Sequence, residues 1–348
     1  MEKEDFFNLL KAVPKAELHL HGEAVPSRET IKDLYFHSKG QKMSEAELDA
    51  LFEYDDLAGF LESFIAIQNY FSRVEDIYLI MQDVGLYMEE NNIVYAEVFF
   101  SPTAHIKRGF AFSDLSDNIA HGIEYVKKTY NRDIKVIVDV SRSFGLDNAM
   151  QNLNFVLNDK SNYIIGIGLG GDEKKGPAKD FAPVFEKAHA NGLHTVVHAG
   201  EICDYHSIKD SIDFLYAERI GHGISSAYDA DFLRELSEKQ VPLEVCLESN
   251  VYTKTYVKEI ESHPIRTIYD AKVPVTINTD DPVFFKTTLI NEFWTLYSKL
   301  HFTISEVKEI LLNSFKYSFL SEKEKESYTK DFEIAWDNWF KNHPDIKE

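Results

Sequence analysis

The chain alternates short apolar runs with segments of helical period. Eight runs are rich in Val, Ile and Leu, as strands buried on both faces should be. The predicted strands are Ala16–Glu23, Val94–Pro102, Lys135–Arg142, Ile164–Glu173, His194–Glu201, Arg219–Gly223, Pro242–Ser249 and Pro274–Pro282. Strands that alternate with helices indicate an α/β fold with a parallel sheet, and eight of them are enough to close a TIM-like (β/α)8 barrel. A doubly wound open sheet is the alternative.

The segments between these runs carry the spacing of amphipathic helices. An apolar stripe at positions i, i+3, i+4, i+7 and i+8 predicts a helix, and it consists of Leu57, Phe60, Leu61, Phe64 and Ile65. The stripe lies in a long helical insertion after the first strand, Met43–Gln82. Further helices are predicted over Phe181–Asn191 and Tyr228–Lys239, and Thr303 to about Pro344 should form extra C-terminal helices outside the barrel. Since no linker splits the chain, we expect one domain over residues 1–348.

Composition narrows the classes of function. With 44% hydrophobic residues, the chain can bury a large core, and its formal net charge of −21 repels phosphate backbones and anionic lipid. Nucleic-acid and membrane partners are therefore not expected, whereas the oligomeric state is left open. Two cysteines cannot form a disulfide framework, and no apolar run reaches the ~18 residues of a membrane span. We expect a cytoplasmic protein that acts on a small molecule.

Two histidine motifs lie at predicted strands in the first and second halves of the chain. His19 and His21 alternate along one strand and so point to the same face, where both could reach one metal ion. His198 and Glu201 follow an apolar strand, at the end where a barrel builds its active site. Taken singly, each motif also fits ordinary strand histidines that bind no metal.

Two further motifs end the sixth and eighth predicted strands. His222 stands between glycines, where the backbone leaves room and water has access, although Gly223 could equally mark a tight turn. Asp280 and Asp281 are adjacent carboxylates at the end of a buried strand, and they repel each other unless a cation or hydrogen bonds compensate. Either aspartate could instead cap a helix. The first is the candidate metal ligand.

Together the four motifs indicate one catalytic metal centre. All fall at the carboxyl ends of predicted strands, and three histidines with one carboxylate suit zinc. A catalytic zinc needs an open position for water, whose pKa it lowers toward about 7. Glu201 and His222 then remain as candidate proton-transfer groups.

The motifs resemble those of the adenosine deaminase family within the metal-dependent amidohydrolases. The similarity runs from about Pro14 to Thr288 and rests on the segments ELHLHGEA, GLGGDE, VVHAGE, ERIGHG and TINTDDP. It implies a distorted eight-stranded α/β barrel with one Zn²⁺ per chain. It also implies hydrolytic deamination of an aminopurine, with adenosine or deoxyadenosine as the leading substrates, to inosine or deoxyinosine plus ammonia.

The resemblance also implies roles for individual residues. The zinc ligands would be His19, His21, His198 and Asp280. Glu201 would protonate the purine N1, and His222 would orient the attacking water and take part in its deprotonation. Asp281 would hold N7 and Gly171 would offer its backbone to the purine. A lid over the sugar pocket would be formed by Leu57, Phe60, Leu61 and Phe64.

Departures from the family pattern bear on the substrate. Gly22-Glu23-Ala24 replaces the usual leucine, aspartate and glycine, and adenine deaminases are similar to this chain in carrying glutamate. Glu23 is therefore a predicted substrate-binding residue whose longer side chain would intrude on the sugar space. Ser101, however, stands where those enzymes carry aspartate. Deamination of adenine or a modified 6-aminopurine is therefore the alternative. A binding barrel without catalysis and another amidohydrolase reaction are more distant ones.

Overall fold

Eight parallel strands form the centre of the molecule. The computed structural model describes residues 1–54 and 57–346, without the side chains of residues 57 and 58. The strands are β1 (Lys15–His21), β2 (Ile93–Phe100), β3 (Asp133–Asp139), β4 (Ile164–Leu169), β5 (His194–Ala199), β6 (Arg219–His222), β7 (Leu243–Val245) and β8 (Val275–Ile277). Each pairs in parallel with the next in chain order, and a bridge between Leu20 and Asp280 joins the first strand to the segment after the last. The predicted (β/α)8 barrel is confirmed, and the open sheet is excluded.

Every predicted strand runs further toward its carboxyl end than the observed one. The prediction Pro242–Ser249 is the clearest case, because β7 stops at Val245 and α12 (Leu247–Thr253) already contains Ser249. Asp280 likewise lies outside β8, with a φ of 64° that no strand residue adopts. Several of the overrun residues are polar and line the cavity described below, among them Glu201, Ser249 and Asp280.

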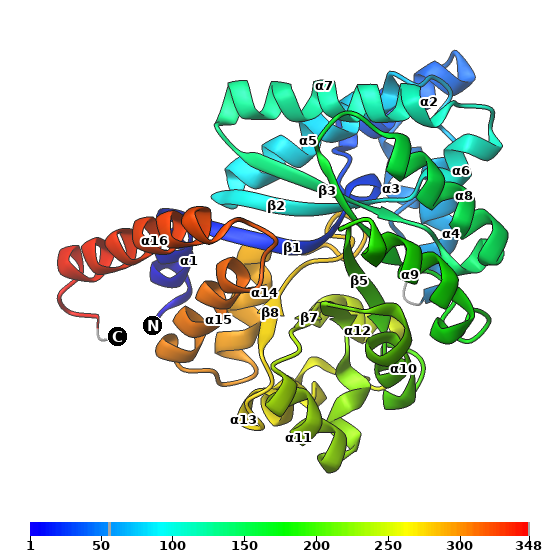
Figure 1. The fold of residues 1–348 in the computed structure, drawn as a ribbon. Coiled ribbons are helices and arrows are strands. Elements are labelled where there is room, and N and C mark those ends of the chain that lie inside the picture. The colour runs from blue at the N-terminus through cyan, green and yellow to red at the C-terminus, as the bar shows by residue number, and fades with distance from the viewer. Residues whose placement is uncertain (55–56, 347–348) are drawn as a thin grey trace.

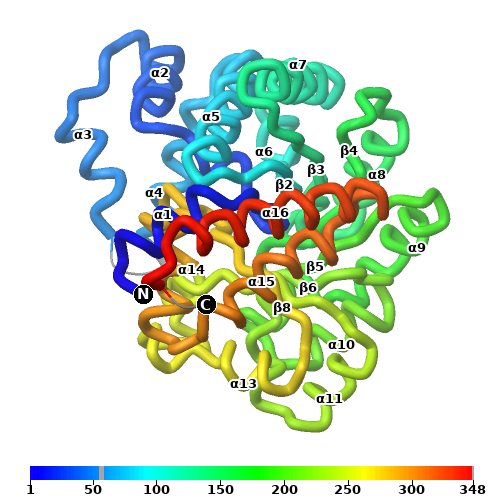
Figure 2. The backbone as a smooth tube through the Cα atoms, turned by 90° about the vertical axis from the view of Figure 1, so that its left-hand side faces the viewer, coloured from blue at the N-terminus to red at the C-terminus, as the bar shows by residue number. Residues whose placement is uncertain are grey.

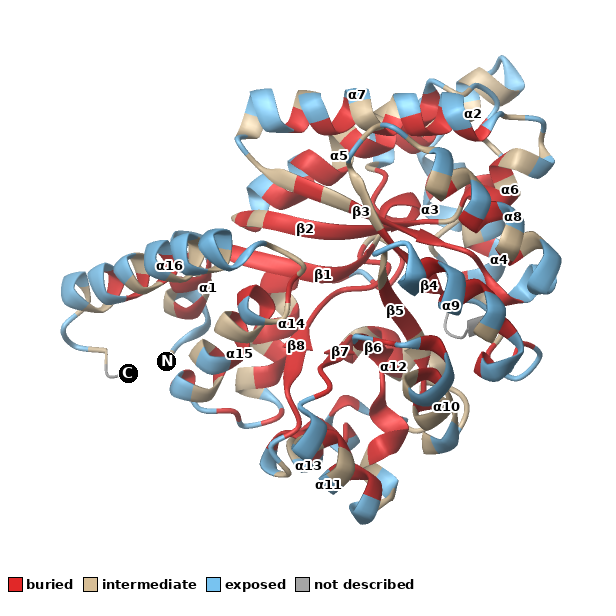
Figure 3. Ribbon diagram, in the orientation of Figure 1, coloured by how far each residue is buried: buried red, intermediate tan, exposed pale blue. Residues whose placement is uncertain are grey.

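Helices surround the barrel (Figure 1). Those between β2 and β8 are α6 (Pro102–Lys107), α7 (Phe112–Tyr130), α8 (Gly145–Asn158), α9 (Ala182–Ala190), α10 (Tyr205–Leu215), α11 (Ala230–Lys239), α12 and α13 (Ile265–Asp270). The predicted helices Phe181–Asn191 and Tyr228–Lys239 correspond to α9 and α11. Both α-helices begin later than predicted because a 3₁₀ turn precedes each one. Figure 3 shows that the strands are buried and that the outer helix faces are exposed.

The insertion after β1 is longer than predicted. It contains α2 (Arg28–Lys39), α3 (Glu45–Ala50), α4 (Leu57–Gln68) and α5 (Asp76–Glu90). The expected apolar stripe lies on α4, whereas the prediction Met43–Gln82 omits α2 and cuts α5 short. Helix α2 has few apolar residues, and its limits are set by the capping residues at its two ends. Ser27 accepts a hydrogen bond from the Thr30 amide at the start, and Gly40 has a φ of 68° at the finish.

The two ends of the chain meet where β1 begins. The C-terminal helices α14 (Leu289–Ser298), α15 (Ile304–Lys316) and α16 (Glu322–Asn342) confirm the predicted helical extension, whereas α1 (Lys3–Ala12) was not predicted. Helix α15 packs on β1 and β8, and α1 contacts α14 and α16. Figure 2 shows α16 lying across this part of the molecule. Among the described residues, no helix is both long and apolar enough to cross a membrane.

Candidate metal and active site

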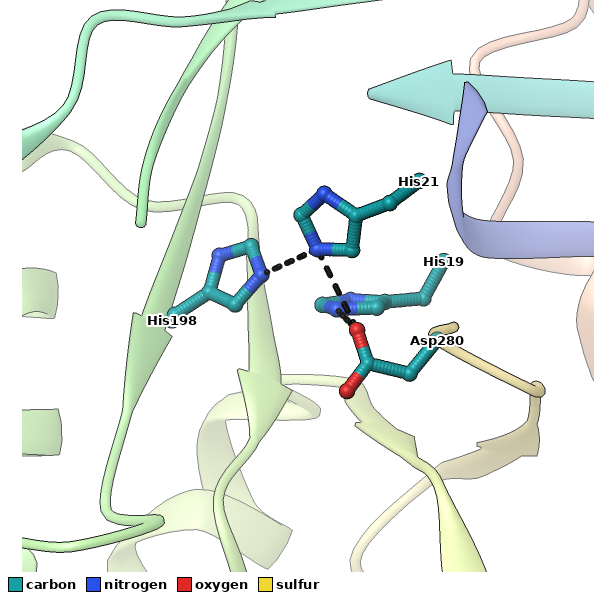
Figure 4. A group of neighbouring side chains, drawn as sticks. All are labelled: His19, His21, His198 and Asp280. Atoms are coloured by element: carbon teal, nitrogen blue, oxygen red, sulfur yellow. Dashed lines mark hydrogen bonds and ion pairs between the residues drawn. The ribbon is translucent and has the colours of Figure 1, made fainter. Parts of the chain in front are cut away.

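Three histidines and one aspartate converge at the carboxyl ends of the strands (Figure 4). One donor atom from each of His19, His21, His198 and Asp280 lies within 4.8 Å of the others. Nε2 of His21 is 3.1 Å from Nε2 of His198 and 3.2 Å from Oδ1 of Asp280. The two N-terminal ligands come from β1, His198 comes from β5, and Asp280 follows β8. The barrel thus brings together the four residues predicted as ligands.

The donor set fits a divalent metal ion. Nδ1 of His19 lies 2.7 Å from Oε2 of Glu244, so this nitrogen donates its proton to the carboxylate and leaves the Nε2 lone pair free. That Nε2 is buried and lies 3.4 Å from Oδ1 of Asp280, another of the four donors, but it forms no hydrogen bond within the described part of the chain. A buried nitrogen without a partner is costly unless a ligand occupies the site.

Two further titratable groups face this point. Nε2 of His222 lies 3.7 Å from Oε2 of Glu201 and 4.0 Å from Oδ2 of Asp280. Burial, followed by the nearby Asp280 carboxylate, raises the pKa of Glu201 well above its usual value, which favours the protonated form of this side chain. His222 and Asp280 have φ values of 62° and 64°, in the left-handed region that non-glycine residues adopt uncommonly.

The groups open onto a cavity of about 580 Å³. Its floor is made by the side chains of His21, His198, Glu201, His222, Asp280 and Asp281. One wall is apolar and includes Phe60 and Leu61 from α4. Gly171 also lines the cavity, with a φ of 100°, and a Cβ there would approach Oγ of Ser143 to 2.4 Å. A flat, partly apolar ligand can therefore lie over the metal site with polar groups around its edge.

The family described as adenosine deaminase matches residues 14–332. The chain belongs to the adenosine deaminase family. It is 30% identical over 327 residues to an adenine deaminase of Psychrobacter cryohalolentis, covering 92% of this chain and 97% of that protein. It is 32% identical over 321 residues to an aminodeoxyfutalosine deaminase of Streptomyces coelicolor, covering 91% and 82%. The deaminase is thus a hydrolase that acts on carbon–nitrogen bonds, and its reaction is hydrolytic deamination of an aminopurine-type substrate.

Solved structures agree with this family assignment. The crystal structure of an adenine deaminase from Arthrobacter aurescens superposes with a TM-score of 0.86 at 28% identity, covering 92% of this chain and 98% of that one. An amidohydrolase from Burkholderia ambifaria, solved with bound Zn, gives 0.88 at 22% identity, covering 96% and 94%. The second likeness shows the fold alone. Deaminases of this superfamily depend on a metal, and the site described above is where the present chain could hold one.

Not every predicted substrate residue of the deaminase lines the cavity. Glu23 lies behind the wall, where its Oε1 accepts a hydrogen bond of 2.8 Å from the Ser101 amide and is 4.0 Å from His105 Nε2. Phe64 packs against Phe284 with ring centroids 5.4 Å apart and is also absent from the wall. The side chain of Leu57 lies outside the described residues. Of the predicted lid, Phe60 and Leu61 therefore reach the cavity.

Sequence reasoning missed several residues that hold the site in place. Glu173 accepts hydrogen bonds from the backbone amides of Gly200, Ile202 and Cys203, which fixes the loop that carries Glu201. Asp139 lines the cavity at the end of β3, and Oγ of Ser249 donates to Oδ2 of Asp280 at 2.7 Å. Asp139 and Ser249 lay within predicted strands at their carboxyl ends. The criterion that identified the metal ligands, a polar side chain at the carboxyl end of a predicted strand, applies to both residues.

Proposed function

We propose that this deaminase adds water to C6 of a 6-aminopurine and releases ammonia, with one zinc ion held by His19, His21, His198 and Asp280. The observation that carries the proposal is the convergence of those four donors beside the buried Glu201, whose pKa burial raises. Bound zinc would supply an activated water by lowering its pKa toward about 7. The chain's own residues would bind the purine and move its protons.

Each polar group has a place in this reaction. Addition to C6 disrupts the aromatic ring and places negative charge on N1, so Glu201 donates its proton to N1. Of the two protons of the attacking water, one returns to Glu201 and the other leaves with the amino group as ammonia. Burial and the neighbouring Asp280 raise the pKa of Asp281 to about 8, so its carboxyl group can donate a hydrogen bond to N7. Gly171 brings its backbone to the purine edge. His222 hydrogen-bonds to the attacking water.

Adenine is the substrate that we favour over adenosine. The relatives named adenine deaminase support it, and so does the acidic edge of the cavity. Glu23 holds the amide of Ser101, whose Oγ donates to Oδ2 of Asp139 at 3.0 Å on the cavity wall. A free base carries an N–H on its five-membered ring, and this group can donate a hydrogen bond to the Asp139 carboxylate. A nucleoside carries the sugar in that position and cannot make this hydrogen bond.

An aminopurine with a large substituent on N9 is the second candidate. One observation favours it, because the cavity of about 580 Å³ extends beyond the polar floor to Lys174 and Thr255. The similarity to the Streptomyces coelicolor aminodeoxyfutalosine deaminase is consistent with such a substrate. This candidate predicts that substituents on the sugar side are tolerated, whereas the adenine proposal predicts that they are not.

A substrate panel separates these possibilities. Zinc-loaded enzyme is given adenine, adenosine, deoxyadenosine and N6-methyladenine, and turnover is followed by ultraviolet absorbance and ammonia release. We expect kcat/KM for adenine to exceed that for adenosine at least ~100-fold, because the sugar removes the N–H that would donate to Asp139 and must be accommodated against the Ser101–Asp139 wall. Equal or reversed values would remove adenine as the preferred substrate. Ammonia release from none of the 6-aminopurines would refute the proposed reaction.

The matched variant is Glu201→Gln, which keeps the shape of the side chain but cannot deliver its proton. We expect normal zinc content and a kcat reduced by about 10²–10⁴-fold, the range typical of a general acid. Near-normal turnover in this variant would contradict the role assigned to Glu201 while leaving the metal site intact.

A further inference from the structure

A row of buried polar groups leads away from His222 on the side opposite Glu201. Nδ1 of His222 is 3.2 Å from Nδ2 of Asn250, on α12. Oδ1 of the same asparagine is 3.2 Å from Nε2 of His263. Nδ1 of His263 in turn lies 3.1 Å from the backbone nitrogen of Ile265, which begins α13. All three side chains are buried, and the reaction as proposed above uses neither Asn250 nor His263.

The backbone amide at the far end gives this row a direction. An N–H group can only donate, so Nδ1 of His263 is an acceptor. Burial lowers the pKa of His263 to about 3, so the ring is neutral and carries its proton on Nε2. That proton goes to Oδ1 of Asn250, which orients the amide so that its NH₂ group faces His222. Nδ1 of His222 therefore accepts a hydrogen bond.

We propose that Asn250 and His263 are positioning residues that fix the tautomer of His222, with its proton on Nε2. The imidazole then faces the reaction centre as a hydrogen-bond donor, toward Glu201 and Asp280, whose oxygens lie 3.7 and 4.0 Å away. In this form Nε2 has no lone pair with which to take a proton from water, and Nδ1 is occupied by Asn250. His222 orients the attacking water by donating to it. This role replaces the part in deprotonation expected from the resemblance.

The tautomer can be measured without substrate, although its use in catalysis rests on the proposed function. Zinc-loaded protein labelled with ¹⁵N-histidine gives two-bond ¹H–¹⁵N correlations that distinguish the two neutral tautomers, and His222→Gln assigns the signal of His222. We expect the pattern of a proton on Nε2, with Nδ1 at the shift of an unprotonated nitrogen. A proton on Nδ1, or on both nitrogens at neutral pH, would overturn the proposal even if deamination were confirmed.

Asn250→Asp tests the direction of the row. An aspartate can still accept from His263, but it presents an acceptor to His222, so the proton should move to Nδ1. We expect the NMR pattern to invert and kcat to fall at least ~100-fold, as when a catalytic histidine is held in the wrong tautomer. KM and zinc content should change less than ~2-fold. An unchanged histidine pattern in the folded variant would contradict the proposal.

Asn148→Asp is the matched control. This asparagine lies on α8, away from the cavity lining, and its Nδ2 donates to the hydroxyl of Thr103, which can reverse its role and donate to an aspartate. A further contact of Nδ2, 3.5 Å to the carbonyl oxygen of Val140, is long and would be lost. We expect the His222 signal and kcat to stay within ~2-fold of the unmodified enzyme. Should Asn250→Asp fail to fold, the tautomer observed in the unmodified protein still decides the question.

Discussion

Charged side chains are buried at both ends of the barrel, but the two groups differ in whether their polar atoms are all hydrogen-bonded. At the amino ends of the strands, Arg219 bonds through Nε to Oε1 of Glu244 at 2.5 Å and also pairs with Glu97. Its Nη1 donates to the carbonyl oxygen of Tyr317 at 3.0 Å. At the carboxyl ends, Nε2 of His19 has no hydrogen-bond partner within the described chain. One cluster is internally satisfied, and the other is incomplete.

The difference separates structural from chemical use of buried polar groups. An ion cluster in which every charge is paired fixes the positions of its side chains. Removing one partner leaves the other charges unpaired in a low-dielectric interior, which is costly. In the second kind of cluster, donor or acceptor atoms that lack a hydrogen bond face a cavity, where a metal ion or a substrate can bind to them. His19 belongs to both, because its Nδ1 bonds to Glu244 in the lower cluster and its Nε2 faces the upper one. The lower cluster thus orients a ligand of the upper one.

Breaking the incomplete cluster should have the largest effect. Asp280→Ala removes the only carboxylate among the four proposed ligands, so we expect zinc stoichiometry to fall well below one per chain and deamination to drop to background. Zinc content is measured by elemental analysis after gel filtration. The control is Asp281→Ala, the adjacent carboxylate, which should retain zinc and lose substrate affinity instead. Full zinc content in Asp280→Ala would show that the ligand set is wrong.

Breaking the satisfied cluster should weaken both stability and metal binding. Glu244→Gln leaves Arg219 and His19 without their shared carboxylate. We expect unfolding free energy to fall by about 3–5 kcal/mol in zinc-free protein and zinc affinity to fall by about 10–100-fold. Denaturant titration and competition with a chelator measure the two quantities.

The matched control for that change is Glu218→Gln at the same end of the barrel. Glu218 pairs with His194 at 3.1 Å, but both side chains are more than one-third exposed. An exposed pair contributes no more than about 1 kcal/mol, so stability and zinc affinity should remain near those of the unmodified protein. Equal effects from the two variants would erase the distinction between the buried cluster and a surface pair.

The apolar wall should give the smallest effect. Leu61 and Ile65 are both on α4 and are 45% and 56% exposed, but only Leu61 is among the residues lining the cavity. Leu61→Ala removes apolar contact worth roughly 1 kcal/mol, so KM should rise on the order of 5-fold at unchanged kcat. Ile65→Ala should leave both constants unchanged. The same KM in both variants would mean that α4 does not contact the substrate.

Much of the architecture was predictable because buried parallel strands have a distinct composition. The eight apolar runs located all eight strands, and the motifs at their ends located the four converging donors. The predicted boundaries were wrong at the carboxyl ends, where residues such as Ser249 alternate like strand residues but belong to a helix. Helix α2 was missed because its limits depend on capping by Ser27 and Gly40 rather than on an apolar stripe.

Interactions between distant segments were beyond sequence reasoning. Glu244 and Arg219 are 25 residues apart, and no local pattern indicates that they meet beneath His19. The position of Glu23 shows the same limit. Its place beside the second histidine suggested contact with the substrate, whereas the structure turns its carboxylate to the Ser101 amide. Side-chain direction at the end of a strand depends on neighbouring strands that are remote in sequence.

The bridge between Leu20 and Asp280 places the metal site where the first strand meets the segment after the last strand, which is where the barrel closes. The amide of His21 donates to the carbonyl of Asp280, and the amide of Asp280 donates to the carbonyl of His19, so the first and last strands are stitched together by the backbone of three proposed ligands. A metal ion bound by the side chains of the same residues would add a second connection between these two segments. Metal binding and closure of the barrel therefore stabilise each other, and a change that separates the first strand from the segment after the last strand also separates the ligands.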